Sequence, residues 1–169
     1  GFFENDKYGI PNGQGMMLVF NQKTGEPVAL LLDDAVLTDI RTAVAGQICA
    51  NKLSNKITNV GIIGTGLQAR LQIKYLNKTN NFSNIYVWGR NQTKMEKYKL
   101  DMENYGFSVT TCSSASEVLK NCNIIITTTA SNKPYISIND ICDIFENSKI
   151  RLILCIDGCV AEHVFFYFW

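Results

Sequence analysis

Residues 59–70 read NVGIIGTGLQAR, an apolar run that breaks into glycines and then restarts with helical spacing. The pattern predicts a strand and a helix joined by a tight turn at Gly64. In such a turn Gly66 lets the backbone approach a diphosphate, and Ala69 lets the helix pack on the strand. The first amides of the helix then face the phosphates. The cofactor-binding residues predicted here are Gly64, Thr65, Gly66, Leu67, Gln68 and Ala69.

The glycine pattern alone is weakly specific, because glycine turns also occur where a helix must simply lie close to a sheet. A second apolar run, residues 84–88, is followed by Gly89 and Arg90, where the second strand of a dinucleotide domain meets the adenosine ribose. NAD-selective sites usually offer an acidic residue there, whereas a guanidinium suits a 2′-phosphate. The sequence therefore favours NADP(H), with NAD(H) possible, and Asn91 and Thr93 are further candidate contacts.

Strand-like and helix-like runs alternate from residue 57 onward, which predicts a parallel sheet with helices on both faces. The predicted fold class is α/β, a Rossmann-type doubly wound parallel sheet preceded by part of a second, β-containing domain. Ligands of such sheets bind beyond the carboxyl ends of the strands, where Gly64, Arg90 and residues 127–131 all fall. The predicted strands are 59–64, 84–88, 108–111, 123–128 and 151–156, and the predicted helices are 67–77, 92–105, 114–119 and 138–145.

Residues 127–131, TTTAS, allow two interpretations. They are either a polar exit loop with capping hydroxyls or, by analogy with this fold, a loop that passes near the nicotinamide. The second interpretation makes Thr128, Thr129, Ala130 and Ser131 cofactor contacts. Gln68 presents a similar choice between a solvated helix residue and a phosphate contact.

The first part of the chain differs in pattern from the rest. Residues 16–20 and 27–32 predict the two strands of a β-hairpin. A lone hairpin is marginal in water, so we expect these strands to belong to a larger sheet whose other strands precede Gly1. Thr38 is predicted to cap a helix that runs through Leu53.

Arg41 stands out within that helix, because a cation in the first turn opposes the helix dipole at a cost of about 0.3–1 kcal/mol. One interpretation is an ion pair with Asp33, Asp34 or Asp39. The other is that Arg41 and the helix N-terminus together bind a substrate carboxylate, which the forked guanidinium matches in shape.

Composition excludes several classes of protein. A chain of 169 residues is long enough for one domain, or for one domain and part of another. A net charge of +1 does not indicate a nucleic-acid partner, and no apolar stretch reaches transmembrane length. Six cysteines without a C-x-x-C pair, beside a single histidine, favour neither a disulfide framework nor a metal site. We expect reduced thiols and a cytoplasmic location.

With these motifs in order, the chain resembles the ornithine cyclodeaminase and μ-crystallin family of NAD(P)-dependent proteins. The resemblance spans about residues 7 to 155. It rests on the motifs at 9–11 (GIP), 24–30 (TGEPVAL), 37–43 (LTDIRTA), 61–69 (GIIGTGLQA), 87–91 (VWGRN) and 124–131 (IIITTTAS), with Pro134.

The resemblance implies a discontinuous substrate and dimerisation domain with a Rossmann domain inserted. It also implies hydride transfer at the carbon bearing the amine or imine of an amino or cyclic imino acid, with Arg41 holding the substrate carboxylate. Family members form homodimers, which truncation puts in doubt for this chain. The predicted domains are 1–54 (partial substrate and dimerisation domain), 55–158 (NAD(P)-binding Rossmann domain) and 159–169 (aberrant or truncated tail).

Two features depart from the pattern that the resemblance implies, and the first of them bears on the reaction. Cyclodeaminases carry an aspartate followed by Pro-Gly-Lys after the last Rossmann strand, whereas residues 155–163 read CIDGCVAEH. This difference disfavours cyclodeamination more than imine reduction. The second departure is the aromatic tail at 165–169, which we expect to be aberrant or truncated. The alternatives to an active reductase are a crystallin-like NADPH-binding protein without turnover and an inactive fragment.

Overall fold

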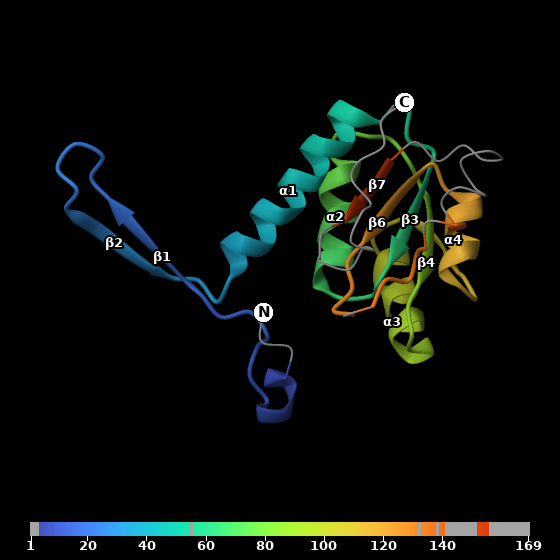
Figure 1. Ribbon diagram of the computed structural model, residues 1–169, viewed down its shortest axis with the longest axis horizontal. Coiled ribbons are helices and arrows are strands. Elements are labelled where there is room, and N and C mark those ends of the chain that lie inside the picture. The colour runs from blue at the N-terminus through green and yellow to red at the C-terminus, as the bar shows by residue number, and fades with distance from the viewer. Residues whose placement is uncertain (1–3, 55, 132, 138, 141–151, 156–169) are drawn as a thin grey trace. The chain divides into compact units, whose positions relative to one another are not determined.

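The computed structural model describes residues 4–54, 56–131, 133–137, 139–140 and 152–155 (Figure 1). The chain forms two compact units, Gly1–Arg41 and Thr42–Trp169. They are called the hairpin unit and the sheet unit below. The division falls within helix α1 (Val36–Leu53).

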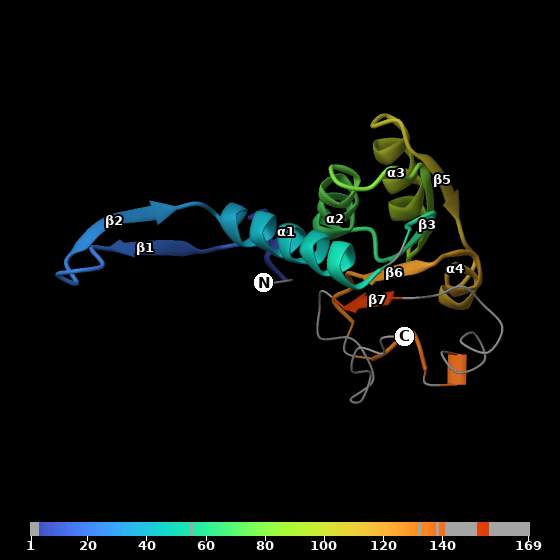
Figure 2. The same ribbon diagram turned by 90° about the horizontal axis from the view of Figure 1, so that it is seen from above.

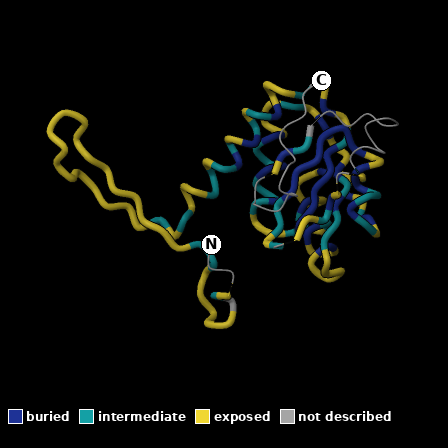
Figure 3. The backbone as a smooth tube through the Cα atoms, in the orientation of Figure 1, coloured by how far each residue is buried: buried dark blue, intermediate teal, exposed yellow. Residues whose placement is uncertain are grey.

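The hairpin unit contains a 3-10 helix, η1 (Asn5–Tyr8), and two antiparallel strands, β1 (Met16–Phe20) and β2 (Pro27–Leu32). Leu18 pairs with Leu30 in the middle of the ladder. The predicted hairpin is therefore confirmed. Every residue of both strands is exposed within the unit (Figure 3).

Helix α1 begins before Thr38, the predicted cap. The Asp33 carboxylate accepts a hydrogen bond from the Leu37 N–H at 2.8 Å, and the Asp33 carbonyl accepts one from the Val36 N–H at 2.8 Å. Asp33 therefore caps this helix. The prediction of Thr38 as cap is wrong, because the helix already begins at Val36, and Asp33, three positions before that start, accepts the hydrogen bonds of its first amides.

The C-terminal part of α1 belongs to the sheet unit. Ala43, Gly46 and Ala50 are buried, and a Cβ on Gly46 would lie 2.9 Å from Gln72 Cδ of the next helix. Small residues thus let the two helices approach closely. The compact sheet unit starts at Thr42, and the predicted domain boundary after residue 54 stays a prediction.

Five parallel strands form the sheet, in the order β5-β4-β3-β6-β7. From the central strand β3 the chain runs through β4 to β5 on one side, and then through β6 to β7 on the other. The change of direction between β3 and β6 creates the switch point where ligands of such sheets bind. The strands are β3 (Asn59–Ile63), β4 (Asn84–Trp88), β5 (Ser108–Thr111), β6 (Ile124–Thr127) and β7 (Leu152–Cys155).

Helices cover both faces of this sheet (Figure 2). Ile62 of β3 joins one buried cluster with residues of α2 (Leu67–Asn77) and α3 (Gln92–Glu103). Its neighbour Ile63 joins a second cluster with residues of α4 (Ala115–Asn121). Successive side chains of a strand point to opposite faces, so the apolar run of β3 is buried on both sides. The predicted doubly wound α/β class is confirmed.

Two predicted segments fall outside this description. The tail at 159–169 lies outside the described residues, and so does most of the helix predicted at 138–145. Across the described ranges, no helix combines the length and the apolar character needed to cross a bilayer.

Candidate nucleotide-binding site

The turn after β3 requires a glycine at position 64. Gly64 has φ +118°, and a Cβ there would lie against the Thr128 carbonyl and 2.7 Å from Thr128 Oγ1. The Thr128 N–H donates to the Ile63 carbonyl at 2.8 Å, which holds the exit of β6 behind the turn. Backbone conformation and close approach therefore both exclude a side chain at Gly64.

Helix α2 begins directly after this turn with an open N-terminus. Gly66 is the N-cap residue and has no side chain with which to cap the helix, and the first turn of α2 holds no acidic residue. A Cβ on Gly66 would meet nothing within 4 Å, and Leu67 is 58% exposed. Ala69, by contrast, is fully buried in the cluster that contains Ile62. The amides of Gly66 and Leu67 at such a helix start suit an anion.

The end of β4 lies against the same turn. The Gly64 N–H donates to the Trp88 carbonyl at 2.8 Å, and a Cβ on Gly89 would lie 3.0 Å from Thr65 Cγ2. Arg90 is exposed and follows directly. The glycine turn and Arg90 are therefore at one edge of the sheet, as the sequence predicts.

An aromatic residue missed by the sequence analysis joins this edge to the loop after β6. The Tyr135 ring packs edge-on against Trp88, with centroids 5.1 Å apart, and Arg90 Cζ lies 5.9 Å from the Tyr135 centroid. No sequence motif marks Tyr135, because its partner strand lies more than forty residues earlier in the chain.

Asn91 and Thr93 occupy the start of α3. The Asn91 side-chain oxygen accepts a hydrogen bond from the Lys94 N–H at 2.9 Å and so caps the helix. Thr93 is exposed in the first turn. The structure therefore gives Asn91 a structural role, and a cofactor contact for either residue stays a prediction.

The hydroxyls of residues 128–131 make local hydrogen bonds. Thr128 Oγ1 donates to the Ile63 carbonyl at 3.4 Å, and Thr129 Oγ1 accepts from the Ser131 N–H at 3.5 Å. Ser131 Oγ donates to the Lys133 carbonyl at 2.9 Å, and Ala130 is exposed. These bonds agree with the exit-loop interpretation. They leave the nicotinamide interpretation untested.

One residue before this loop has an unusual environment. Thr127 is 4% exposed, and its Oγ1 has no hydrogen-bond partner within the described part of the chain. Buried hydroxyls are nearly always paired. This orphaned oxygen at the carboxyl end of β6 is compatible with a polar ligand at the edge.

Gln68 packs within the helix layer. Its Oε1 accepts a hydrogen bond from Gln72 Nε2 at 3.3 Å, and Gln72 Nε2 also donates to the Thr42 carbonyl at 3.1 Å. Gln72 is 1% exposed. Gln68 is thus anchored toward α1 by a buried amide, and its contact with a phosphate stays a prediction.

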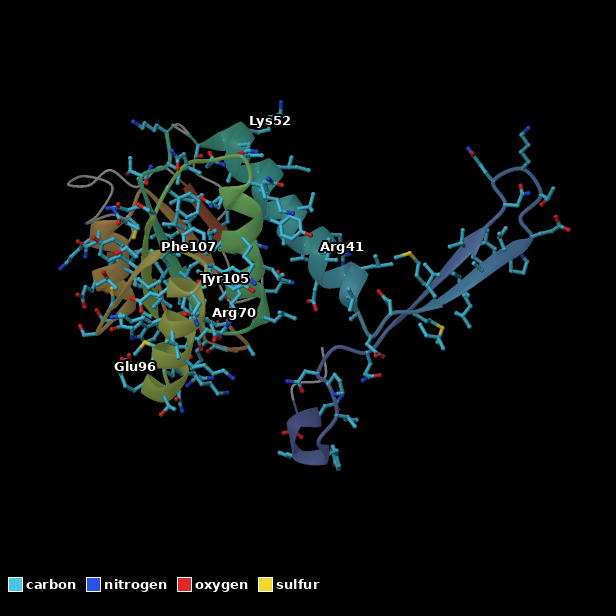
Figure 4. All side chains as sticks on the ribbon, turned by 180° about the vertical axis from the view of Figure 1, so that it is seen from behind. Arg41, Lys52, Arg70, Glu96, Tyr105 and Phe107 are labelled. Atoms are coloured by element: carbon cyan, nitrogen blue, oxygen red, sulfur yellow. The ribbon has the colours of Figure 1, made fainter. Side chains whose placement is uncertain are left out.

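Arg41 lies in the hairpin unit, on the exposed surface of α1 (Figure 4). It forms none of the ion pairs recorded among the described residues, so the pairing with Asp33, Asp34 or Asp39 is not observed. Its role as a carboxylate ligand stays a prediction.

Arg70 is a second residue that the sequence analysis missed. Its guanidinium donates to the Thr65 carbonyl at 2.6 Å and to Asp101 Oδ2 of α3 at 2.6 Å. The stretch 59–70 ends at Arg70, but nothing in the sequence marks an aspartate 31 positions later as its partner. These contacts tie the glycine turn to α3.

Comparison with known proteins gives one family match. The model of the ornithine cyclodeaminase/mu-crystallin family matches residues 1–142. An uncharacterized cyclodeaminase of Sinorhizobium fredii is 37% identical over 137 residues, which are 79% of this chain and 41% of that protein. The chain therefore spans about two fifths of the length of the curated relatives it matches.

Solved structures give a similar result. Delta(1)-pyrroline-2-carboxylate reductase of Thermococcus litoralis, in complex with NADH and L-proline, superimposes with a TM-score of 0.71 at 30% identity, over 79% of this chain and 42% of that one. An archaeal alanine dehydrogenase dimer with bound NAD gives a TM-score of 0.73 at 28% identity, over 81% and 42%.

Proposed function

Because the chain belongs to the ornithine cyclodeaminase/mu-crystallin family, we propose that it binds a nicotinamide adenine dinucleotide and serves as an oxidoreductase of amino or cyclic imino acids. The observation that carries the proposal is the meeting of the glycine turn and Arg90 at the carboxyl edge of the sheet, where the Gly64 N–H donates to the Trp88 carbonyl at 2.8 Å.

The residues at this edge fit such a cofactor. The start of α2 at Gly66 and Leu67 receives the diphosphate, since Gly66 has no side chain to cap the helix. The exposed Arg90 receives the adenosine ribose end. The loop at 128–131, beside the orphaned Thr127 hydroxyl, lines the nicotinamide end.

We further propose a preference for NADP(H) over NAD(H). The structures of the two relatives above contain NADH and NAD, so they do not support this preference. It rests on Arg90, whose guanidinium suits a 2′-phosphate, and on the lack of an acidic residue at 89–91.

The bound nicotinamide would supply or accept a hydride at the carbon that bears the amine or imine. The chain's own contribution is orientation and charge. Arg41 holds the substrate carboxylate with its parallel N–H donors. We favour reduction of a cyclic imine over cyclodeamination, because residues 155–163 contain no Pro-Gly-Lys segment.

Fluorescence titration with NADPH and with NADH tests the proposal. We expect the chain to bind NADPH more tightly, and Arg90→Asp to shift the ratio of the two dissociation constants toward NADH by about tenfold or more, because a charged hydrogen bond is replaced by repulsion. Lys97→Asp is the matched control, since this exposed lysine lies further along α3. It should leave the ratio unchanged.

Failure of both cofactors to bind would contradict the proposal. An unchanged ratio in Arg90→Asp would contradict the preference for NADP(H). Saturable binding of NADPH without its consumption across a panel of cyclic imino acids would select the alternative, a binding protein without turnover.

A further inference from the structure

The Arg70 guanidinium turns back from α2 toward the glycine turn. Nη1 donates to the Thr65 carbonyl at 2.6 Å and to the Gly66 carbonyl at 3.0 Å. Nε and Nη2 donate to Asp101 Oδ2 at 3.0 and 2.6 Å. Figure 4 shows Arg70 between α2 and α3. One side chain therefore joins the turn after β3 to the helix after β4.

Tyr98 holds the guanidinium from a third side. Arg70 Cζ lies 5.0 Å from the Tyr98 ring centroid, within the range of a cation–π interaction. The Tyr98 ring is fully buried, and its hydroxyl donates to the Ala69 carbonyl at 3.2 Å. Burial raises the pKa of Tyr98 above its ordinary value, so the phenol stays neutral and keeps this bond. The Arg70 side chain is only 18% exposed, which distinguishes this pair from a solvated surface pair.

The two carbonyls that Arg70 binds control the direction of two amides. The Thr65 carbonyl and the Gly66 N–H belong to one planar peptide unit, and the Gly66 carbonyl and the Leu67 N–H belong to the next. In a trans peptide the N–H points opposite to the C=O. Fixing both oxygens on the side of Asp101 therefore turns the Gly66 and Leu67 amides to the other side.

The Thr65 carbonyl depends most on this contact. Gly66 is the N-cap, so its carbonyl can also accept the first bond of the helix ladder. Thr65 precedes the helix and lies outside that ladder. The guanidinium also offsets the partial negative charge of both oxygens, which would otherwise repel a nearby anion.

We propose, in an inference that rests on the proposed function, that Arg70 is a positioning residue anchored by Asp101. It orients the Gly66 and Leu67 amides toward the cofactor diphosphate and does not itself touch the diphosphate. The competing idea is that Arg70 binds the diphosphate directly. The two ideas predict opposite effects on diphosphate binding when the charge of Asp101 is removed. Removing its charge loosens the anchor of a positioning residue, but it frees a direct ligand to bind the anion more tightly.

The test uses displacement of bound NADPH, or of NADH, by ADP and by adenosine. The ratio of the inhibition constant of adenosine to that of ADP reports what the diphosphate contributes to binding. We expect this ratio to fall about tenfold in Arg70→Gln and to fall also in Asp101→Asn, because charged hydrogen bonds are lost in each. Glu103→Gln, which removes the i,i+4 partner of Lys99 on the same helix, is the matched control and should leave the ratio unchanged. Arg70→Lys should retain only part of the wild-type ratio.

The outcomes separate the possibilities. A larger ratio in Asp101→Asn would identify Arg70 as a direct phosphate ligand and overturn the inference. Equal weakening of ADP and adenosine, with a lowered melting temperature, would show a purely structural role and also overturn it. An unchanged ratio in both variants overturns this inference alone, whereas a wild-type chain that binds neither NADPH nor NADH overturns the proposed function with it.

Discussion

The hairpin unit and the sheet unit are built from similar apolar strands, yet they bury them very differently. In β6 every residue is buried, whereas in β1 and β2 every residue is exposed (Figure 3). Leu32 of β2 is 73% exposed and Ile125 of β6 is fully buried. An apolar, β-forming run therefore determines an extended backbone but not the burial of its side chains.

The difference follows from the connections between the strands. Parallel strands need long crossovers, and in the sheet unit the crossovers between β3 and β6 contain α2, α3 and α4, the helices that cover both faces. The connection between β1 and β2 consists of residues 21–26 and contains no helix. An antiparallel hairpin thus supplies no covering layer from its own sequence, and no described residue of the hairpin unit shields these side chains from water.

The sharpest test of this contrast truncates one apolar side chain in each unit. Ile62→Ala should lower the free energy of unfolding by about 2–5 kcal/mol, because it leaves a cavity in a core where Ile62 is fully buried. Leu30→Ala, at a position that is 53% exposed, should change it by less than about 0.5 kcal/mol. Urea unfolding followed by circular dichroism measures both. Equal losses would mean that β2 is buried as deeply as β3.

A second test compares two glycines with positive φ. Gly64→Ala should cost about 2–4 kcal/mol, because the new Cβ adds overlap with Thr128 to the strain of a φ of +118°. Gly25→Ala, in the hairpin connection at φ +73°, meets nothing within 4 Å and should cost about 1 kcal/mol. Thermal unfolding gives the costs, and NADPH titration should show loss of binding in Gly64→Ala only. Normal binding by that variant would contradict the proposed site.

The smallest expected effect concerns pH and the start of α4. Glu117 Oε2 accepts hydrogen bonds from the Ser113 hydroxyl and N–H, both at 2.7 Å, and these bonds lower the pKa of Glu117 below its ordinary value of 4.5. A lowered pKa in the folded state adds stability above the unfolded pKa, and this stability is lost as the pH falls through the folded value.

Glu117→Gln should therefore remove a small part of the difference between urea midpoints at about pH 7 and about pH 4. Ser113→Ala should remove less, since the bond from the Ser113 N–H remains. A difference in midpoints that is unchanged by Glu117→Gln would show that these bonds do not favour the carboxylate.

Much of the site was predictable because its signals are local. The glycine turn and the ends of the strands follow from residue types within a few positions, and the carboxyl ends of parallel strands meet at one edge in any such sheet. Thr38 shows where local reasoning is insufficient. Both Thr38 and Asp33 are good capping residues, and only the path of the chain between them decides which one caps α1.

The sequence by itself determined the alternation of strands and helices, the hairpin, the turn at Gly64 and the presence of a cation at position 90, because period and turn chemistry act over short distances. Only the tertiary structure decided that Thr128 packs against the turn at Gly64, that Tyr135 lies beside Arg90, and that Arg70 donates hydrogen bonds to Asp101. Those contacts join residues about 30 or more positions apart, and their geometry depends on how complete helices pack on the sheet.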